Sequence, residues 1–415
     1  MSRPAFAADT EADPPDNDDF AAAVLERMAA VLPPEDGPYP LHEPHIDGAA
    51  WSYVKDCLDS GWVSSVGEYV RWFEEKLVET TGAAHAVATV SGTAALHICM
   101  LLAGVQRDDE VLVPPLTFVA SANAIHYCGA HPHFVDVEPV SLGVDPTALT
   151  AHLERIAEMR GDVCFNSVTG RPIRGLLVVH CFGHPARIAE LAEVAARFNI
   201  VLIEDAAEAL GTSAGNRSAG CHGKVAALSF NGNKTVTTGG GGAILTDDDE
   251  LAELALHLTT TARVDDPFVL AHDMVAFNYR MPNLNAALGC AQLEQLPELL
   301  AAKRQLAARW REAFAGLGGL RFIDEPSWGK SNFWLNALSL DPPYATRRPQ
   351  LLAALDAAGY HCRPFWTPLH RLPMYQDRPM ASLQVADDLA ARGFNLPSSA
   401  GLIRPGTLPI FDKNG

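Results

Sequence analysis

The sequence predicts an α/β protein: a mainly parallel β-sheet covered by helices on both faces, followed by a smaller α+β domain. Seven short runs are apolar along their whole length, as strands buried on both faces are. These runs are residues 86–90, 110–114, 133–137, 175–182, 200–205, 225–230 and 241–246. They alternate with stretches that are apolar at helical spacing. From about residue 318 the pattern changes to short strands, one helix and a Pro-rich region.

The helical stretches and the change of pattern suggest three parts of the chain. Helices are expected over residues 91–105, 118–130, 146–160 and 187–199, and a long helical stretch spans 283–314 with Pro297 near its middle. We expect a large domain over residues 37–300 and a small C-terminal domain over 301–415. Residues 1–36 are acidic and rich in Asp and Pro at their start, which predicts a disordered leader, with helical spacing in its "FAAAVLERMAAVL" segment.

Composition narrows the classes of function. Hydrophobic residues make up 48% of the chain and charged residues 20%, as in soluble globular enzymes. The formal net charge of −19 argues against nucleic acid and against an anionic membrane surface as partners. No apolar stretch is long enough to span a membrane. The eight cysteines lack zinc-ligand spacing, so we expect no metal site and a reducing, cytoplasmic location.

The segment "SFNGNKTVTTGGGGAILT", residues 229–246, places Lys234 shortly before four consecutive glycines. It is not a phosphate-binding P-loop, because Asn233 separates Gly232 from the lysine and the glycine run follows the lysine. A dinucleotide fingerprint is also missing, because "SGTAAL" after the first strand holds a single glycine.

Three polar features fall at the carboxyl ends of predicted strands, where ligands of parallel sheets gather. They are Ser91-Gly92-Thr93, Glu204-Asp205 and the Ser229–Lys234 segment. The first two have ordinary structural explanations: a capped helix without a ligand, and carboxylates that face solvent or cap the next helix. Pyridoxal phosphate accounts for all three together, since it needs a lysine for a Schiff base, a helix N-terminus with hydroxyls for its phosphate, and an acid beside its pyridinium nitrogen.

The chain resembles the nucleotide-sugar aminotransferases of the DegT/StrS type, which are fold type I pyridoxal-phosphate enzymes with a seven-stranded sheet. The resemblance covers residues 38–402. It is carried by the order and spacing of "SGTAALH", "PPLTFVASANAI", "FVDVEPVSLGVDP", "HCFGHP", "EDAAEALG", "SFNGNKTVTTGGGGAI", "FNYRMPNLNAALG" and "PLHRLPMY".

This resemblance implies roles for the cofactor-binding residues. Lys234 is the expected Schiff-base lysine and proton shuttle, and Asp205 the partner of the pyridinium nitrogen. The amides of Gly92 and Thr93 and the hydroxyl of Ser229 are expected to hold the phosphate. In addition, Phe118 occupies the position where the family stacks an aromatic ring on the cofactor.

Two further positions concern the subunit arrangement and a departure from the family pattern. Asn278 matches an asparagine that reaches the phosphate from the neighbouring subunit, which implies a homodimer with shared active sites.

Glu208 stands where the family usually has His or Gln, near the phenolic oxygen of the cofactor. A carboxylate there repels a phenolate unless it is protonated or turned away.

The resemblance also suggests substrates. The family mostly aminates keto sugars attached to a nucleoside diphosphate, with L-glutamate as the usual donor. The segments 40–75 and 228–246 look most like the branch acting on UDP-4-keto-6-deoxy-N-acetylhexosamines, which feeds surface polysaccharides. Arg280, Arg363 and His370 are candidates for the diphosphate or the donor carboxylate, with ordinary ion pairing as the alternative.

Three rival functions remain at this stage. A sugar dehydratase of the same fold has histidine in place of the lysine, so Lys234 argues against it. An amino-acid aminotransferase shares the cofactor residues but lacks the sugar-family motifs after residue 270. A catalytically inactive regulator is disfavoured by the intact Lys234, Asp205 and Ser229.

Overall fold

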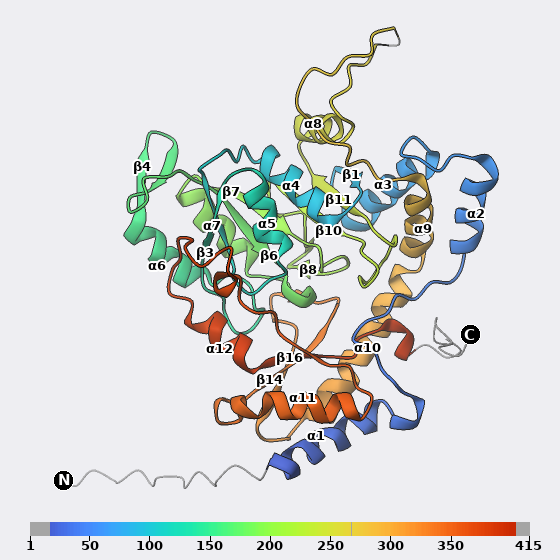
Figure 1. Cartoon of the computed structure of the whole chain (residues 1–415), viewed down its shortest axis with the longest axis vertical. Coiled ribbons are helices and arrows are strands. Elements are labelled where there is room, and N and C mark those ends of the chain that lie inside the picture. Colours follow the sequence, from blue (N-terminus) through green and yellow to red (C-terminus); the bar gives the residue numbers. More distant parts are fainter. Residues whose placement is uncertain (1–16, 267, 404–415) are drawn as a thin grey trace.

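A seven-stranded sheet forms the centre of the larger part of the molecule (Figure 1). The computed structural model describes residues 17–266 and 268–403. In spatial order the strands are β1 (His85–Thr89), β11 (Gly242–Thr246), β10 (Val225–Ser229), β7 (Val201–Asp205), β6 (Ile173–Val179), β2 (Glu110–Val113) and β3 (His131–Phe134). β11 is antiparallel to both of its neighbours, and the other pairings are parallel. The predicted α/β fold with a mainly parallel seven-stranded sheet is confirmed.

Helices cover both faces of this sheet, because its strands are apolar on both sides. One face packs against α4 (Gly92–Leu102), α5 (Ala120–Tyr127) and α8 (Asp249–Thr259). The opposite face packs against α3 (Glu68–Thr81), α6 (Pro146–Ile156), α7 (Ile188–Arg197) and α9 (Asn283–Glu294), and α2 (Ala50–Ser60) packs on α9. Neighbouring strand residues alternate between the two cores: Val111 and Val113 belong to the first core, and Leu112 to the second.

The expected helix over residues 146–160 is wrong at its C-terminal end. The helix stops at Ile156, and β4 (Ala157–Arg160) turns back through Gly161 to pair with β5 (Val163–Asn166). Strand geometry places Glu158 and Arg160 on the same side, where they form an ion pair of 2.8 Å. The hairpin was missed because its exposed residues carry no long apolar run.

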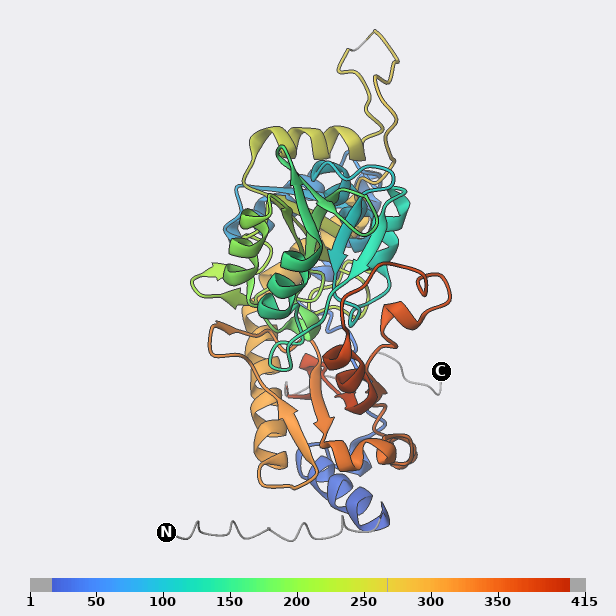
Figure 2. The same cartoon turned by 90° about the vertical axis from the view of Figure 1, so that its left-hand side faces the viewer.

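A second, smaller part contains a four-stranded antiparallel sheet (Figure 2). Its strands, in spatial order, are β12 (Leu320–Ile323), β14 (Asn336–Leu340), β16 (Gly393–Leu396) and β15 (Arg363–Pro364). The helices of this part are α10 (Leu296–Phe314), α11 (Arg348–Ala357) and α12 (Gln384–Arg392). The long helical stretch predicted over 283–314 is divided between α9 and α10 at Gln295, just before Pro297, whose ring nitrogen cannot donate a helical hydrogen bond.

Several short elements complete the described chain. They are the small sheet of β8 (Ser213–Ala214), β9 (Arg217–Ser218) and β13 (Gly329–Lys330), and the 3-10 turns η1 (Pro34–Asp36), η2 (Cys181–Gly183), η3 (Pro342–Arg347), η4 (Leu369–Arg371) and η5 (Ala400–Leu402). Within the described ranges, no helix combines the length and apolar character needed to cross a bilayer.

The helix α1 (Asn17–Val31) packs against the smaller part of the molecule, as both views show (Figures 1 and 2). Its buried side chains Phe20, Val24 and Met28 share a core with Leu306 and Trp310 of α10. Helical spacing was expected in this segment. The first sixteen residues of the expected leader lie outside the described residues.

We expect Met28→Ala to lower the free energy of unfolding by about 2–5 kcal/mol, because the side chain is fully buried in the core that α1 shares with α10 and the four-stranded sheet. The matched control is Arg27→Ala on the exposed side of α1, which should change it by less than about 0.5 kcal/mol. Urea unfolding of both variants measures the difference. Equal stabilities of the two variants would show that α1 does not pack as described.

Candidate active site

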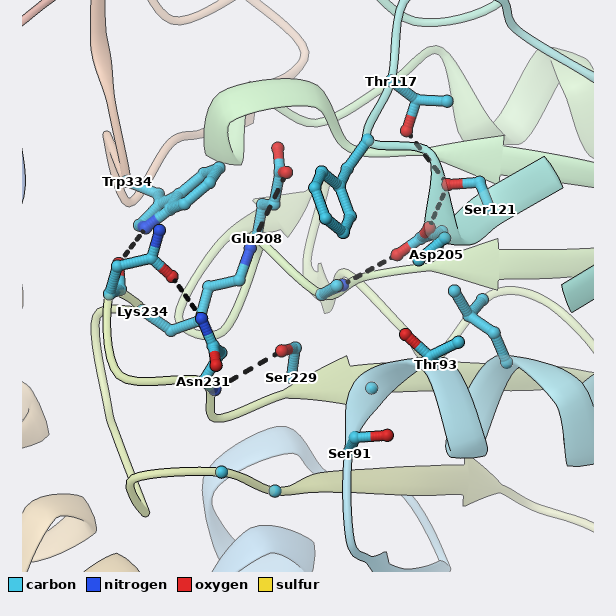
Figure 3. Close-up of a pocket in the computed structure, with 18 of the residues that line it drawn as sticks. Ser91, Thr93, Thr117, Ser121, Asp205, Glu208, Ser229, Asn231, Lys234 and Trp334 are labelled. Carbon is cyan, nitrogen blue, oxygen red and sulfur yellow. Dashed lines mark hydrogen bonds and ion pairs between the residues drawn. The ribbon is translucent and has the colours of Figure 1, made fainter. Parts of the chain in front are cut away.

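A pocket of about 380 Å³ lies where the parallel strands β1, β7 and β10 end (Figure 3). Its polar and aromatic lining comes from several elements. It includes Ser91, Gly92, Thr93, Thr117, Phe118, Ser121, Asp205, Glu208, Ser229, Lys234, Trp334 and Trp366. Residues from all three polar features predicted to converge therefore meet in one pocket, although Glu204 does not line it.

Lys234 reaches this pocket from a tight turn that follows β10. Its amide donates to the carbonyl of Asn231 at 2.9 Å, which closes the turn, and its Nζ lies 3.7 Å from Oε1 of Glu208. The ring centroid of Trp334 is 3.6 Å from the same Nζ. Burial lowers the pKa of the Lys234 amine, while the nearby Glu208 and Asp205 carboxyls act in the opposite direction. A lysine poised in this way loses its proton more readily than one in water.

The glycines after Lys234 allow the returning strand to pass the start of α4. A Cβ on Gly242 would lie 2.5 Å from the carbonyl carbon of Ser91 and 2.6 Å from the amide nitrogen of Gly92, which is too close for any side chain. Gly92 itself approaches β10, since a Cβ there would lie 2.7 Å from the Cβ of Ser229. Glycine at these positions brings the turn of Lys234 and the N-terminus of α4 together.

The N-terminus of α4 supplies an anion-binding cradle. Ser91 caps the helix, with its Oγ accepting the Ala94 N–H at 3.1 Å. The side chains of Ser91, Thr93 and Ser229 lie around this helix end in Figure 3. Amides at a helix N-terminus favour a negatively charged group such as a phosphate.

Asp205 ends β7 inside the pocket and is held by donors. Its Oδ2 accepts the Ser121 hydroxyl at 2.7 Å, its Oδ1 accepts the Ala207 N–H at 3.2 Å, and Thr117 lies 3.0 Å from the Ser121 hydroxyl. Burial raises the pKa of this carboxyl, and the donors oppose that effect. These hydrogen bonds fix the orientation of the Asp205 carboxyl, which still lines the pocket.

Glu204, next to Asp205 in sequence, has a structural role. Adjacent strand residues point to opposite faces, and Glu204 is buried away from the pocket. It accepts hydrogen bonds from His180 at 2.9 Å and from the amides of Gly220, His222 and Gly223 at 2.6–2.8 Å. Burial raises its pKa, but these donors outweigh burial and lower it overall.

Glu208, the carboxylate that departs from the family pattern, is held in the pocket by two contacts. Its Oε2 accepts the Phe182 N–H at 2.7 Å, and its other oxygen faces Lys234. Burial raises the pKa of Glu208 to about 7, against the lowering effect of Lys234. The carboxyl can therefore carry a proton near neutral pH, which removes the repulsion expected from a fixed negative charge.

Of the remaining predicted residues, one lines the pocket and the others lie elsewhere in this chain. Phe118 lines the pocket and is exposed, but Asn278 and Arg280 line a separate surface hollow. Arg280 pairs with Glu74, at 2.9 Å in one of its contacts, and His370 pairs with Asp387 at 3.3 Å. Arg363 is exposed on β15. The roles expected for Asn278, Arg280, Arg363 and His370 stay predictions, and ordinary ion pairing accounts for two of them within one subunit.

Sequence reasoning missed the aromatic wall of the pocket. Trp334 precedes β14 and donates its indole N–H to the carbonyl of Asn233 at 2.7 Å. Trp366 packs with its ring centroid 4.7 Å from that of Phe182. Both tryptophans come from the smaller part of the molecule, whose position relative to Lys234 no local pattern reveals.

The fold and the lysine, aspartate and helix N-terminus in this pocket define a fold type I pyridoxal-phosphate aminotransferase. Residues 44–405 match the model of the DegT/DnrJ/EryC1/StrS aminotransferase family, and the chain belongs to that family. The predicted resemblance and the predicted cofactor are both confirmed.

Individual relatives agree with this assignment. The chain is 36% identical to the GDP-perosamine synthase of Vibrio cholerae, over 88% of this chain and 94% of that protein. It is 37% identical to the GDP-perosamine synthase of Caulobacter vibrioides, over 86% and 92% respectively. Among solved structures, DesI in the presence of its TDP-sugar product is 31% identical with a TM-score of 0.76, covering 87% of this chain and 88% of that one.

We expect the stability of the cofactor-free protein to depend on pH through Glu208. The folded state raises the pKa of this group to about 7, so folding binds a proton between roughly pH 4.5 and 7. The stabilisation of the folded state by this bound proton is fully present below about pH 4.5 and is lost as pH rises through 7. Between pH 5 and 8 the wild type should lose roughly 2–3 kcal/mol relative to Glu208→Gln, measured by denaturant unfolding.

The matched control for this measurement is the exposed Glu193, which lies away from the pocket. Glu193→Gln should follow the wild-type pH dependence closely. An identical pH dependence of the wild type and Glu208→Gln would contradict the buried, proton-binding carboxyl described above.

Proposed function

We propose that the protein transfers the amino group of L-glutamate to the keto group of a 4-keto-6-deoxy sugar carried by a nucleoside diphosphate, with GDP as the nucleotide. The observation that carries the proposal is the meeting of Lys234, Asp205 and the N-terminus of α4 in one pocket. The two relatives named GDP-perosamine synthase support the GDP-linked sugar. The UDP-linked N-acetylhexosamine expected from the sequence has not been confirmed and serves as the competing substrate.

The pocket residues fit pyridoxal phosphate. The α4 N-terminus with Ser91, Thr93 and Ser229 offers amides and hydroxyls for a phosphate, and the glycine contacts keep side chains out of that cradle. Asp205 presents a fixed carboxyl, and Lys234 presents the primary amine. When bound, the cofactor accepts electrons from the substrate carbon that loses its proton.

Each protein group then has one task. Lys234 would hold the cofactor through its amine and would move a proton to and from the reacting carbon, and its lowered pKa favours the neutral amine that proton removal requires. Asp205 would face the ring nitrogen, where its negative charge would favour the protonated form of that nitrogen. Glu208 has a pKa of about 7, so it can gain or lose a proton near neutral pH and thereby change the charge beside Lys234. Trp334 and Trp366 shield the reacting centre from water.

The charge of the pocket supports the proposed sharing of active sites between two subunits. Among the described residues that line it, Lys234 is the one basic side chain, accompanied by the carboxyls of Asp205 and Glu208. A sugar diphosphate and a glutamate carboxylate both need further cationic or amide donors. A second copy of the chain is the source we propose, with Asn278 reaching the phosphate in trans.

Exposed apolar side chains support the same homodimer. Val66, at 73% exposure, lines the hollow that contains Asn278, and the nearby Trp62 is 59% exposed. The chain between α8 and α9 projects far from the body (Figures 1 and 2), and it carries Leu270 at 84% and Val275 at 91% exposure. Apolar groups gathered on projecting or open surfaces are typical of protein interfaces.

The substrate proposal is tested by direct assay. The purified protein, loaded with pyridoxal phosphate and L-glutamate, should convert a GDP-4-keto-6-deoxyhexose to the amino sugar, detected by mass spectrometry together with 2-oxoglutarate. Lys234→Ala should lower the rate by roughly 10³-fold or more, since no other amine lines the pocket among the described residues. Lys224→Ala, on an exposed residue before β10, should keep the wild-type rate.

Conversion of UDP-4-keto-6-deoxy-N-acetylhexosamine in preference to the GDP sugar would overturn the nucleotide assignment and keep the reaction. Retention of the rate in Lys234→Ala would overturn the mechanism itself.

Shared active sites predict complementation between two variants. Asn278→Ala and Lys234→Ala should each have low activity alone. After mixing and exchange of subunits, half of the dimers are mixed and each has one complete site, so activity should rise to about one quarter of wild type. The assay is the sugar amination above, with unmixed variants as controls. No gain after verified subunit exchange would place Asn278 outside the neighbouring site.

A further inference from the structure

A lysine on α10 that does not line the cofactor pocket is fully buried without a carboxylate partner in the part of the chain that the structure describes. Lys303 is 1% exposed. Its Nζ donates to the carbonyl of Ser398 at 2.7 Å and to the carbonyl of Trp334 at 3.1 Å, and it lies 2.9 Å from Nε2 of His42. The mechanism proposed above does not use this amine.

The three partners of Lys303 come from three distant segments of the chain. His42 belongs to the segment that leads from α1 to α2, Trp334 precedes β14, and Ser398 follows β16. Further hydrogen bonds join the same segments. The amide of Ser398 donates to the carbonyl of Leu41 at 2.7 Å, and the amide of Asn336 donates to Oγ of Ser398 at 2.8 Å. Lys303 therefore lies at the point where these segments meet.

One of these partners forms the wall of the active site. Trp334 is fixed at three points: Lys303 holds its carbonyl, Asn332 Oδ1 accepts its amide at 2.8 Å, and Asn233 accepts its indole N–H. Its ring covers the amine of Lys234. A displaced carbonyl at Trp334 would therefore move the ring and change the environment of the reactive amine.

A buried ammonium costs more than an apolar side chain of the same size, so packing alone does not explain Lys303. Burial lowers its pKa to about 7. His42, the titratable side chain in contact with it, has a pKa held well below its usual range, by burial first and then by Lys303, so its neutral ring can accept the hydrogen bond. Lys303 instead fixes the positions of the three groups to which it is hydrogen-bonded.

We propose that Lys303, together with His42, is a positioning residue that fixes Trp334 against Lys234. The proposal rests on the function proposed above only in giving Lys234 its catalytic role. The segment carrying His42 begins before residue 44, where the match to the family model starts. His42 itself therefore lies just before the matched residues.

The main test compares Lys303→Met with Trp310→Phe. Methionine keeps the length of the side chain but donates no hydrogen bond. Trp310 lies on the same helix and donates to the carbonyl of Pro397 at 3.1 Å rather than to Trp334, so its replacement matches the loss of one buried donor. Two properties are measured: hydrogen exchange of the amides at Trp334, Leu335 and Asn336 in the cofactor-free protein, and the pH midpoint for capture of pyridoxal phosphate by Lys234, followed by absorbance.

We expect Lys303→Met to accelerate exchange at these three amides by about tenfold or more and to shift the pH midpoint of cofactor capture by roughly half a unit or more. Trp310→Phe should leave both at the wild-type values. Unchanged exchange and an unchanged midpoint in Lys303→Met would overturn the proposal. Equal changes in Trp310→Phe would also overturn it, because they would show a general loss of stability.

A second variant keeps the proposal testable if Lys303→Met does not fold. His42→Leu removes one partner but leaves the bond from Lys303 to Trp334, so it should change the same two properties in the same direction by a smaller amount. No change in His42→Leu would contradict the role of His42. Exchange is measured without cofactor or substrate, so this test stands even if the sugar assay fails.

Discussion

The active site depends on one close approach of backbone. β11 must return between β1 and β10 immediately beside the N-terminus of α4, and a Cβ on Gly242 would lie 2.5 Å from the Ser91 carbonyl. Any side chain there would separate the turn of Lys234 from the helix end that accepts an anion. The antiparallel strand in an otherwise parallel sheet is therefore what places the amine and the anion cradle in one pocket.

The chemistry of the pocket follows from burial balanced by neighbouring groups. Lys234, Asp205 and Glu208 are all removed from water, which favours the neutral form of each. The attraction between Lys234 and the two carboxyls opposes this effect, whereas the charge of Asp205 raises the pKa of Glu208 further. Such a balance suits a reaction in which a proton is removed from one carbon and returned to another.

Much of this arrangement could be predicted from the sequence. All seven strands of the main sheet were expected from apolar runs, and the polar residues at their ends identified the pocket. The β4–β5 hairpin could not be found because its exposed strands have no such runs. Trp334 and Lys303 were missed for another reason: their roles arise from contacts between segments far apart in sequence. The assignment of Asn278 to a neighbouring subunit likewise needs information that one chain does not contain.

Peptide mapping after borohydride reduction of the protein incubated with pyridoxal phosphate tests directly whether Lys234 is the reactive amine. Reduction makes the link between amine and cofactor permanent, so mass spectrometry can locate it. We expect the added mass on Lys234, within the peptide that follows β10. Modification of other lysines with Lys234 unmodified would contradict the central role given to this residue.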